Sequence, residues 1–458
     1  MTRLFKLGTS TSNVSLTNEL VSKQHIIDND DDIKALNSGV LLIQKELPGT
    51  VQPPISSKTF IELTPEGKNL VYEYTQPRLK PWIQSEWITS QQLYQVGQLI
   101  LKQQNLLNKN GLSFCDARPE NYFLHGLPRL VDIGSIKGLS RQNYLSFQAD
   151  FVNHFLAPLS YEQKLGLPVS SFLKARLHKC DNVSLPYMCL KKSPSALSLI
   201  FEQAIDRHLS SKISKSSPAF VEYLLATHKE DGKTVIKTTR AAKKTKRLAR
   251  ILEECRPRAI KKTHWSSYSE FHDSRYANNK YNAVTAFIAS LDAKTICIDL
   301  GSNVSSLDIK GITAFVDRDL AVCNLLRKCS DNNQAVLCAD IGYEMLCAAN
   351  QEMNTCLNLG ANNSAAIATS LMHHVIIDQG LPVECFYLSL SRLYSKVLLE
   401  FIMPTDPMLR LMIARKDEAI LWSWDQHERI CTKWFHISEP QYLSSTRFAV
   451  QITNRSIR

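Results

Sequence analysis

The last two hundred residues contain five short, strongly apolar runs separated by stretches with helical periodicity. Runs of this kind, alternating with helical segments, are typical of βαβ units in a parallel sheet. Two more strand-like runs, KWFHIS and RFAVQIT, follow near residue 440. We therefore expect an α/β domain over residues 263–458. The five runs are KTICIDL, ITAFVD, QAVLCAD, AAIATSL and KVLLEFI, at residues 294–300, 312–317, 334–340, 365–371 and 396–402.

The net charge of +11 in this 458-residue chain is concentrated in one segment. Between Arg240 and Lys262, ten basic residues stand against two glutamates. The same segment places Leu248, Ile251, Leu252 and Cys255 at the spacing of one apolar helix face. We expect a helical basic linker over residues 196–262. The alternative is a stripe that binds RNA or an acidic surface, although no aromatic stacking pattern accompanies it.

No window approaches the roughly 18 consecutive apolar residues of a membrane span, and the first twenty residues lack an apolar signal core. The twelve cysteines contain no CxxC pair, and several lie inside apolar runs, where reduced cysteine behaves as a small hydrophobe. We expect a cytoplasmic protein without a membrane span. The histidines are dispersed without an HxxxH pattern, so we expect no structural metal.

In the N-terminal half, the β-like runs VLLIQKEL, KTFIEL and KNLVYEY precede a helical pattern at Gln91–Asn108. FCDARPEN at 114–121 and LVDIGS at 130–135 then resemble the catalytic and metal-binding loops of protein-kinase-like phosphotransferases. The resemblance places Asp116 as the catalytic aspartate, Asn121 five residues on, and Asp132 where the metal-binding aspartate stands.

This half departs from the kinase pattern in two ways. Phe114-Cys115 replaces the loop histidine, and no GxGxxG precedes it, with Lys45 a loose candidate for the phosphate-binding lysine. We expect residues 1–195 to form an α+β kinase-like accessory domain with an eroded catalytic loop. Asp116, Asn121 and Asp132 remain candidates for nucleotide or metal binding there.

The C-terminal half carries a nucleotide-binding pattern. The strand TICID ends at Asp299 and enters a turn at Gly301, where a missing Cβ lets the backbone approach a ligand. The next strand ends in Asp317, whose carboxylate can accept both ribose hydroxyls of an adenosine ligand. A third strand ends in Asp340.

Longer motifs make this half resemble a class I S-adenosylmethionine-dependent methyltransferase, of the bacterial nodulation-related or polysaccharide-locus type. The matching segments are DLGSN at 299–303, VDRD at 316–319, SLMHHV at 370–375 and LLEFIMPTDPM at 398–408. The upstream THWSSYSEFHDSRYANNKYNAV resembles the family's lead-in helix. The resemblance implies a seven-stranded Rossmann-like sheet and S-adenosylmethionine as cofactor, held by Asp299, Gly301, Asn303, Asp317 and Asp340.

Methyl transfer to a hydroxyl is helped by a base near neutrality, and histidine suits that task. His373 and His374 follow the fourth strand, and Glu400 lies near the end of the fifth, so these three are the candidate catalytic residues. Adjacent histidines point differently, so at most one is expected to act as the base; packing or capping by both is the alternative. The chain departs from the family at Val304-Ser305-Ser306 and at Ser364.

The leading interpretation is a methyltransferase acting on a hydroxyl of a saccharide, a glycan precursor or another small acceptor. Two alternatives remain open: a kinase-like phosphotransferase, and a non-catalytic two-domain scaffold.

Overall fold

The computed structural model describes residues 3–5, 12–16, 20–27, 30–64, 67–77, 79, 85–124, 128–174, 237–257, 273–302, 309–330, 334–342, 346, 362–416 and 422–456. The chain divides into two compact units: Met1–Leu79 with Ser90–Arg258, and Lys80–Thr89 with Ala259–Arg458. The expected boundaries at 195 and 262, and the cofactor candidate Asn303, lie outside the described residues. Of the helices described, none is both long and apolar enough to span a membrane.

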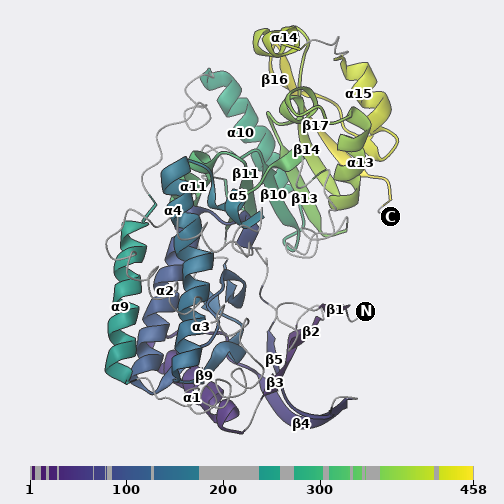
Figure 1. Cartoon of the computed structure of the whole chain (residues 1–458). Coiled ribbons are helices and arrows are strands. Elements are labelled where there is room, and N and C mark those ends of the chain that lie inside the picture. The colour runs from purple at the N-terminus through teal and green to yellow at the C-terminus, as the bar shows by residue number, and fades with distance from the viewer. Residues whose placement is uncertain are drawn as a thin grey trace, which may run out of the picture. The chain divides into compact units, whose positions relative to one another are not determined.

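The first unit begins with an antiparallel five-stranded sheet (Figure 1). Its order is β1-β2-β3-β5-β4, so β1 and β4 form its edges. The runs KTFIEL and KNLVYEY, expected as strands, lie in β4 and β5. The strands are β1 (Arg3–Phe5), β2 (Ser12–Leu16), β3 (Leu20–Ile27), β4 (Ser56–Thr64) and β5 (Gly67–Pro77).

The run VLLIQKEL is helical, so its assignment as a strand was wrong. It forms the second half of α1 (Asp30–Glu46), which connects β3 to β4. Three aspartates in the first turn favour a helix through its dipole. The buried positions Leu36, Val40 and Ile43 recur at helical spacing, which a reading of residues 40–47 alone could not reveal.

The rest of the first unit is mainly helical. The expected helix at Gln91–Asn108 is confirmed as α2 (Ser90–Lys109). Two small sheets, β6 with β9 and β7 with β8, hold the loops that contain Asp116, Asn121 and Asp132. Their strands are β6 (Leu112–Phe114), β7 (Tyr122–Phe123), β8 (Arg129–Leu130) and β9 (Ile136–Gly138), and the helices that follow are α3 (Arg141–Phe151), α4 (Ala157–Leu165) and α5 (Val169–Lys174).

The described part of the basic segment is helix α9 (Thr238–Glu254), which packs along α2 (Figure 1). Its apolar face, with Leu248, Ile251 and Leu252, is buried. The Tyr94 hydroxyl donates to Glu253 Oε1 at 2.6 Å, which ties α2 to the end of α9. The segment expected as a linker thus contributes a packed helix to the first unit.

The second unit is built on a large mixed sheet. Its order is β12-β11-β10-β13-β14-β17-β15, with β16 also paired to β17. Neighbours from β12 to β14 run parallel, whereas β17 is antiparallel to β14, β15 and β16. Within the described residues the sheet has eight strands rather than the seven expected, because the short β16 precedes β17. The strands are β10 (Ile296–Leu300), β11 (Ala314–Asp317), β12 (Ala335–Cys338), β13 (Ser364–Ala368), β14 (Lys396–Ile402), β15 (Phe435–Ile437), β16 (Gln441–Ser444) and β17 (Arg447–Asn454).

Helices of this unit cover the sheet and bury its apolar strands. Phe287 of α10 and Leu326 of α11 share one core with Phe315, Val336 and Ile367 of the strands. Helix α11 is capped at its start, where the Asp319 carboxylate accepts from two backbone N–H groups. The helices are α10 (Ser274–Ala289), α11 (Leu320–Cys329), a π-helical turn at His374–Asp378, α13 (Val383–Leu393), α14 (Pro407–Ala414) and α15 (Trp424–Cys431).

Candidate active site

The polar side chains of the second unit collect where its parallel strands end. Asp299 lies in β10, Asp317 ends β11, and Asp340 follows β12. Ser370 follows β13, and Glu400 lies in the second half of β14. Carboxyl ends of parallel strands share one edge of a sheet, and open α/β sheets bind ligands there.

The turn after β10 needs glycine. Gly301 has φ +72°, and a Cβ built on it would meet Leu371 Cδ1 at 3.1 Å. Its N–H donates to the Val316 carbonyl oxygen at 2.9 Å, which holds the turn against the end of β11. Asp299, just before it, is 2% exposed. The backbone at this position therefore runs close to its neighbours, as a loop that cradles a ligand requires.

Asp317 and Asp340 have different surroundings. Burial raises the pKa of Asp317 to about 7, even though one carboxylate oxygen accepts the Asp319 N–H at 2.6 Å. The Asp340 carboxylate accepts from the Gln379 amide at 3.0 and 3.1 Å and lies 3.8 Å from Arg318 Nη1. The charge of Asp340 is thus stabilised by the Gln379 amide and the Arg318 guanidinium, whereas Asp317 accepts a hydrogen bond from a backbone N–H group.

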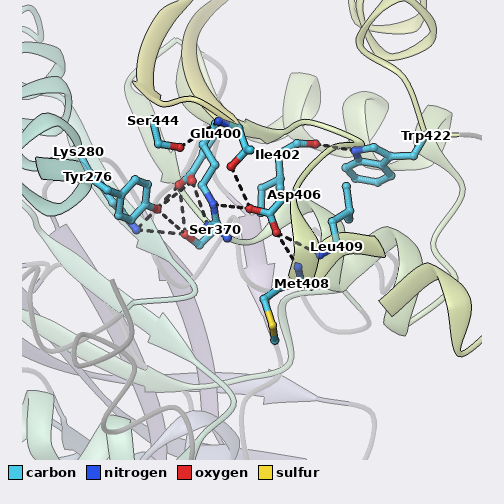
Figure 2. A network of polar contacts seen from close by, with 12 residues as sticks. Tyr276, Lys280, Ser370, Glu400, Ile402, Asp406, Met408, Leu409, Trp422 and Ser444 are labelled. Carbon is cyan, nitrogen blue, oxygen red and sulfur yellow. Dashed lines mark hydrogen bonds and ion pairs between the residues drawn. The ribbon is translucent and has the colours of Figure 1, made fainter. Parts of the chain in front are cut away.

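Glu400 is the centre of a polar network (Figure 2). The Tyr276 hydroxyl donates to Oε1 at 2.8 Å, and the Ser370 hydroxyl donates to Oε2 at 3.1 Å. Arg447 Nη1 lies 3.4 Å from Oε1, and Lys280 Nζ lies 3.9 Å from Oε2. With a fully buried side chain and four polar neighbours, Glu400 joins α10, β13, β14 and β17.

Arg447 extends this network to the start of α14. Its Nε lies 3.2 Å from Asp406 Oδ2, while Asp406 Oδ1 accepts the backbone N–H groups of Met408 and Leu409 (Figure 2). The segment LLEFIMPTDPM therefore supplies two carboxylates to one arginine. Glu400 comes from its strand, and Asp406 comes from its helix cap.

Ser370 is the only non-glycine residue of the described chain with positive φ, at +57°. A left-handed backbone at a residue with a Cβ costs about 1–2 kcal/mol, so surrounding contacts must hold it. Lys280 Nζ donates to its hydroxyl at 3.2 Å, and the Tyr276 oxygen lies 3.2 Å from it. This held turn directs the chain from β13 into the segment that carries both histidines.

His373 and His374 have unequal environments although their ring centroids lie 4.0 Å apart. His373 is 5% exposed, and burial lowers its pKa well below the ordinary value, with the charges of His374, Arg447 and Lys280 acting the same way. His374 is partly exposed, and its Nδ1 lies 2.9 Å from Asp378 Oδ2. Burial also lowers the pKa of His374, with Asp378 opposing that shift.

In the first unit, Asp116 and Asp132 have different charged partners. Asp116 Oδ1 lies 3.2 Å from Arg118 Nε, which also lies 3.6 Å from Asp150 Oδ2. Burial raises the pKa of both Asp116 and Asp150, and Arg118 opposes that shift. The carbonyl oxygen of Asn121 accepts from the backbone of Val131 and Asp132, at 2.9 and 3.1 Å, so Asn121 contacts this loop through its backbone.

Asp132 is held by the five-stranded sheet. Lys23 Nζ lies 3.8 Å from Oδ2, and His25 Nε2 and the Tyr74 hydroxyl both lie 3.4 Å from Oδ1. Burial alone would raise the pKa of Asp132, but Lys23, His25 and the Gly134 N–H together lower it. A Cβ at Gly134 would meet the His25 ring at 2.5 Å, so this glycine permits the close approach.

Several of these partners were missed in the sequence. Lys23 contacts Asp132, whereas Lys45, the residue considered for phosphate binding, lies in the last turn of α1. Asp378, four residues after His374, was detectable from its helical spacing. Nothing in the local sequence marks Lys23 or Arg447 as a partner of an acid. Lys23 lies more than one hundred residues from Asp132 along the chain.

No group of three or more His, Cys, Asp or Glu side chains is close enough to hold a metal ion among the described residues. None of the eight cysteines in that part of the chain forms a disulfide. Ser364, where the methyltransferase pattern often has an acid, is fully buried and donates to the Leu393 carbonyl oxygen at 2.5 Å.

Comparison with known proteins gives distant structural likenesses. No protein-family model and no curated protein matches this chain. The bifunctional kinase-methyltransferase WbdD is 15% identical with a TM-score of 0.28, over 43% of this chain and 43% of that one. A Pyrococcus horikoshii OT3 protein is 10% identical with a TM-score of 0.30, over 41% of this chain and 96% of that one. A SAM-dependent methyltransferase from Thermotoga maritima is 11% identical with a TM-score of 0.26, over 42% of this chain and 99% of that one. Likenesses of this size do not assign the chain to a family.

Proposed function

We propose that this chain is an S-adenosylmethionine-dependent methyltransferase that acts on a hydroxyl of a saccharide, a glycan-related molecule or another small acceptor. The observation that carries the proposal is the His374–Asp378 pair, which lies on the segment after β13 in a unit whose acids collect at the same strand ends. A histidine oriented by a carboxylate is the arrangement that general-base chemistry uses.

The residues at the ends of β10 and β11 fit the proposed cofactor. Gly301 provides the close backbone approach, and Asp317 provides carboxylate oxygens for ribose hydroxyls. Asp299 and Asp340 extend the acidic edge toward a cationic ligand, and Asn303 remains a candidate by its motif. When bound, S-adenosylmethionine supplies an electrophilic methyl group.

In this proposal His374 is the base. Donation from Nδ1 to Asp378 leaves the lone pair of the neutral ring on Nε2, which would accept the proton of the acceptor hydroxyl. A lowered pKa keeps the ring neutral at physiological pH, as a base must be. His373, more deeply buried, would pack beneath it.

We assign Glu400 to positioning rather than proton transfer. Two hydroxyl donors and two cations already surround its carboxylate. It would fix Ser370, and through that turn the direction of the histidine segment.

For the rest of the chain we propose a kinase-like accessory domain at 1–195, a basic segment at 196–262 whose helix α9 packs on the first unit, and the methyltransferase domain at 263–458, in a cytoplasmic protein. The accessory domain would bind the substrate or position the acceptor. A kinase-like phosphotransferase is the alternative, because Lys23 on β3 lies 3.8 Å from Asp132, and kinases carry their phosphate-binding lysine on the third strand of the corresponding sheet.

Thermal-shift titration of the full chain tests the proposal. S-adenosylmethionine at one hundred times its Kd should stabilise the fold by about 2.7 kcal/mol, and Asp317→Ala should weaken that response. Stabilisation by ATP with magnesium alone would support phosphotransfer instead, and no response to either would support a scaffold. Labelled methyl transfer onto fractionated cell extract would then identify the acceptor class.

A further inference from the structure

In the part of the chain that the structure describes, strand β4 forms one edge of the five-stranded sheet. Among the described residues its only strand partner is β5, along all nine residues from Ser56 to Thr64 (Figure 1). An edge strand of this length presents a row of backbone donors and acceptors to which another strand can pair.

The side chains of β4 protect this edge only in part. Ile61 is 62% exposed and Leu63 is 75% exposed, and both belong to the face formed by the odd-numbered residues. Natural edge strands usually carry charges or proline that discourage pairing. β4 has no proline, and its two charged residues are Lys58 and Glu62.

The ladder with β5 determines which backbone groups point outward. Thr64 pairs with Gly67, only two positions of the chain separate them, and the closing pair of a hairpin with that spacing is hydrogen-bonded. Because antiparallel pairs alternate, the even-numbered residues of β4 bond to β5. The N–H and C=O groups of the odd-numbered residues, from Ser57 to Leu63, are therefore directed away from β5.

We propose that β4 pairs antiparallel with β4 of a second copy of this chain, in a register centred on Phe60. In that register Lys58 of each copy stands opposite Glu62 of the other, so the two opposite charges form two equivalent pairs about a twofold axis. The outward backbone groups of Thr59 and Ile61 then face each other as hydrogen-bonded pairs.

The same register joins the apolar side chains. Ile61 and Leu63 of both copies fall on one face of the joined sheet, and the Phe60 rings meet at the centre of the other. Lys58 and Glu62 occupy non-hydrogen-bonded positions, where opposing side chains lie closest. A shift of the register by two residues would place Lys58 opposite Thr64 in one direction or opposite Phe60 in the other. Either shift would lose both Lys58–Glu62 charge pairs.

One strand pair is smaller than the roughly 1,600 Å² of a standard stable interface. The dimer is therefore a concentration-dependent one, in equilibrium with monomer. It involves only the first unit, so it is independent of the proposed methyl transfer.

Sedimentation of the full chain over a concentration series tests the pairing. Lys58→Glu places like charges opposite each other twice and should raise the dimer dissociation constant about tenfold or more. The double variant Lys58→Glu/Glu62→Lys restores opposite charges and should return the constant to within about threefold of the original. Lys102→Glu on α2 is the matched control, because it makes the same charge change at an exposed site away from β4.

The double variant also separates pairing from folding. Lys58 lies 3.0 Å from Glu73 within the same sheet, and both variants lose that contact. Three outcomes would each overturn the proposal. The dimer is lost in both variants, Lys58→Glu leaves the dimer unaffected, or the chain stays monomeric throughout the concentration series. Recovery in the double variant alone supports it.

Discussion

Glu400 in the second unit and Asp132 in the first are surrounded by the same kinds of group. Each carboxylate accepts from a tyrosine hydroxyl, Tyr276 or Tyr74, and each lies beside a lysine and a second basic side chain. Their burial differs, because the Glu400 side chain is 0% exposed and that of Asp132 is 27% exposed.

The two carboxylates make similar contacts, but the chain segments that they hold in place are different. Glu400 fixes Ser370, and the segment after Ser370 carries a histidine oriented by a carboxylate. Asp132 fixes a loop whose other acid, Asp116, is compensated by Arg118. Similar ion clusters therefore do not imply similar functions, and the two carboxylates differ in the segments that they hold in place.

The largest effect should come from His374→Ala. Loss of the proposed base should lower turnover by about 10²–10⁴-fold with cofactor affinity little changed, measured by single-turnover labelled methyl transfer and calorimetry. His373→Ala is the neighbouring control, and Asp132→Ala should leave methyl transfer nearly intact. If both histidine variants keep near-normal turnover, positioning alone drives the reaction.

The pH dependence should identify the same histidine. Burial lowers the pKa of His374, so the ring stays neutral until the pH falls below the ordinary value of about 6.5. Turnover should therefore hold through neutrality and decline only below about pH 6.5, as the imidazole becomes protonated. A decline that begins above pH 7, or one unchanged in Asp378→Asn, would contradict this assignment.

Removal of the two central carboxylates should have unequal costs. Glu400→Ala leaves buried Arg447 without one partner and should lower the free energy of unfolding by about 3–5 kcal/mol. Asp132→Ala acts at a partly exposed site, and we expect about 1–2 kcal/mol. Urea unfolding followed by circular dichroism measures the free energy of unfolding of both variants. Equal losses in the two variants would contradict the expectation that the more deeply buried carboxylate costs more to remove.

Asp317→Ala should weaken cofactor binding by about one to two orders of magnitude, through loss of charge-assisted bonds to ribose. Burial raises the pKa of Asp317 to about 7, and only the ionised carboxylate accepts from both hydroxyls. Affinity measured by calorimetry should therefore fall as the pH drops below about 7, and Asp317→Asn should remove that dependence. Unchanged affinity in both variants would rule out the ribose assignment.

The smallest effect concerns the turn that Glu400 holds. Ser370→Ala and Ser370→Gly both lose the hydroxyl, but only glycine tolerates φ +57° without strain. We expect the glycine variant to be more stable by about 1 kcal/mol in urea unfolding. If alanine is equally stable, the turn relaxes and the network does not hold it.

Local sequence patterns predicted the strands of the second unit well. Four of the five parallel strands lie within the runs identified by their apolar character, and β13 begins one residue before its run, at Ser364. A strand buried on both faces is apolar throughout, which makes such runs visible in the sequence. Strand β16 was missed: it is four residues long and pairs only with β17 in the described chain. Residues 40–47 were misread because the helix period becomes visible only from Leu36 onward.

Some features of this protein were determined by the sequence alone. Continuous apolar runs specify the parallel strands, and the position of each acid in its run places Asp299, Asp317 and Glu400 near strand ends. The role of each carboxylate depended on the tertiary structure, since Arg447 and Tyr276 approach Glu400 from segments 47 and 124 residues away. Periodicity reports burial within one element, whereas the charge and hydrogen-bond donors around a buried group come from elements that meet only on folding.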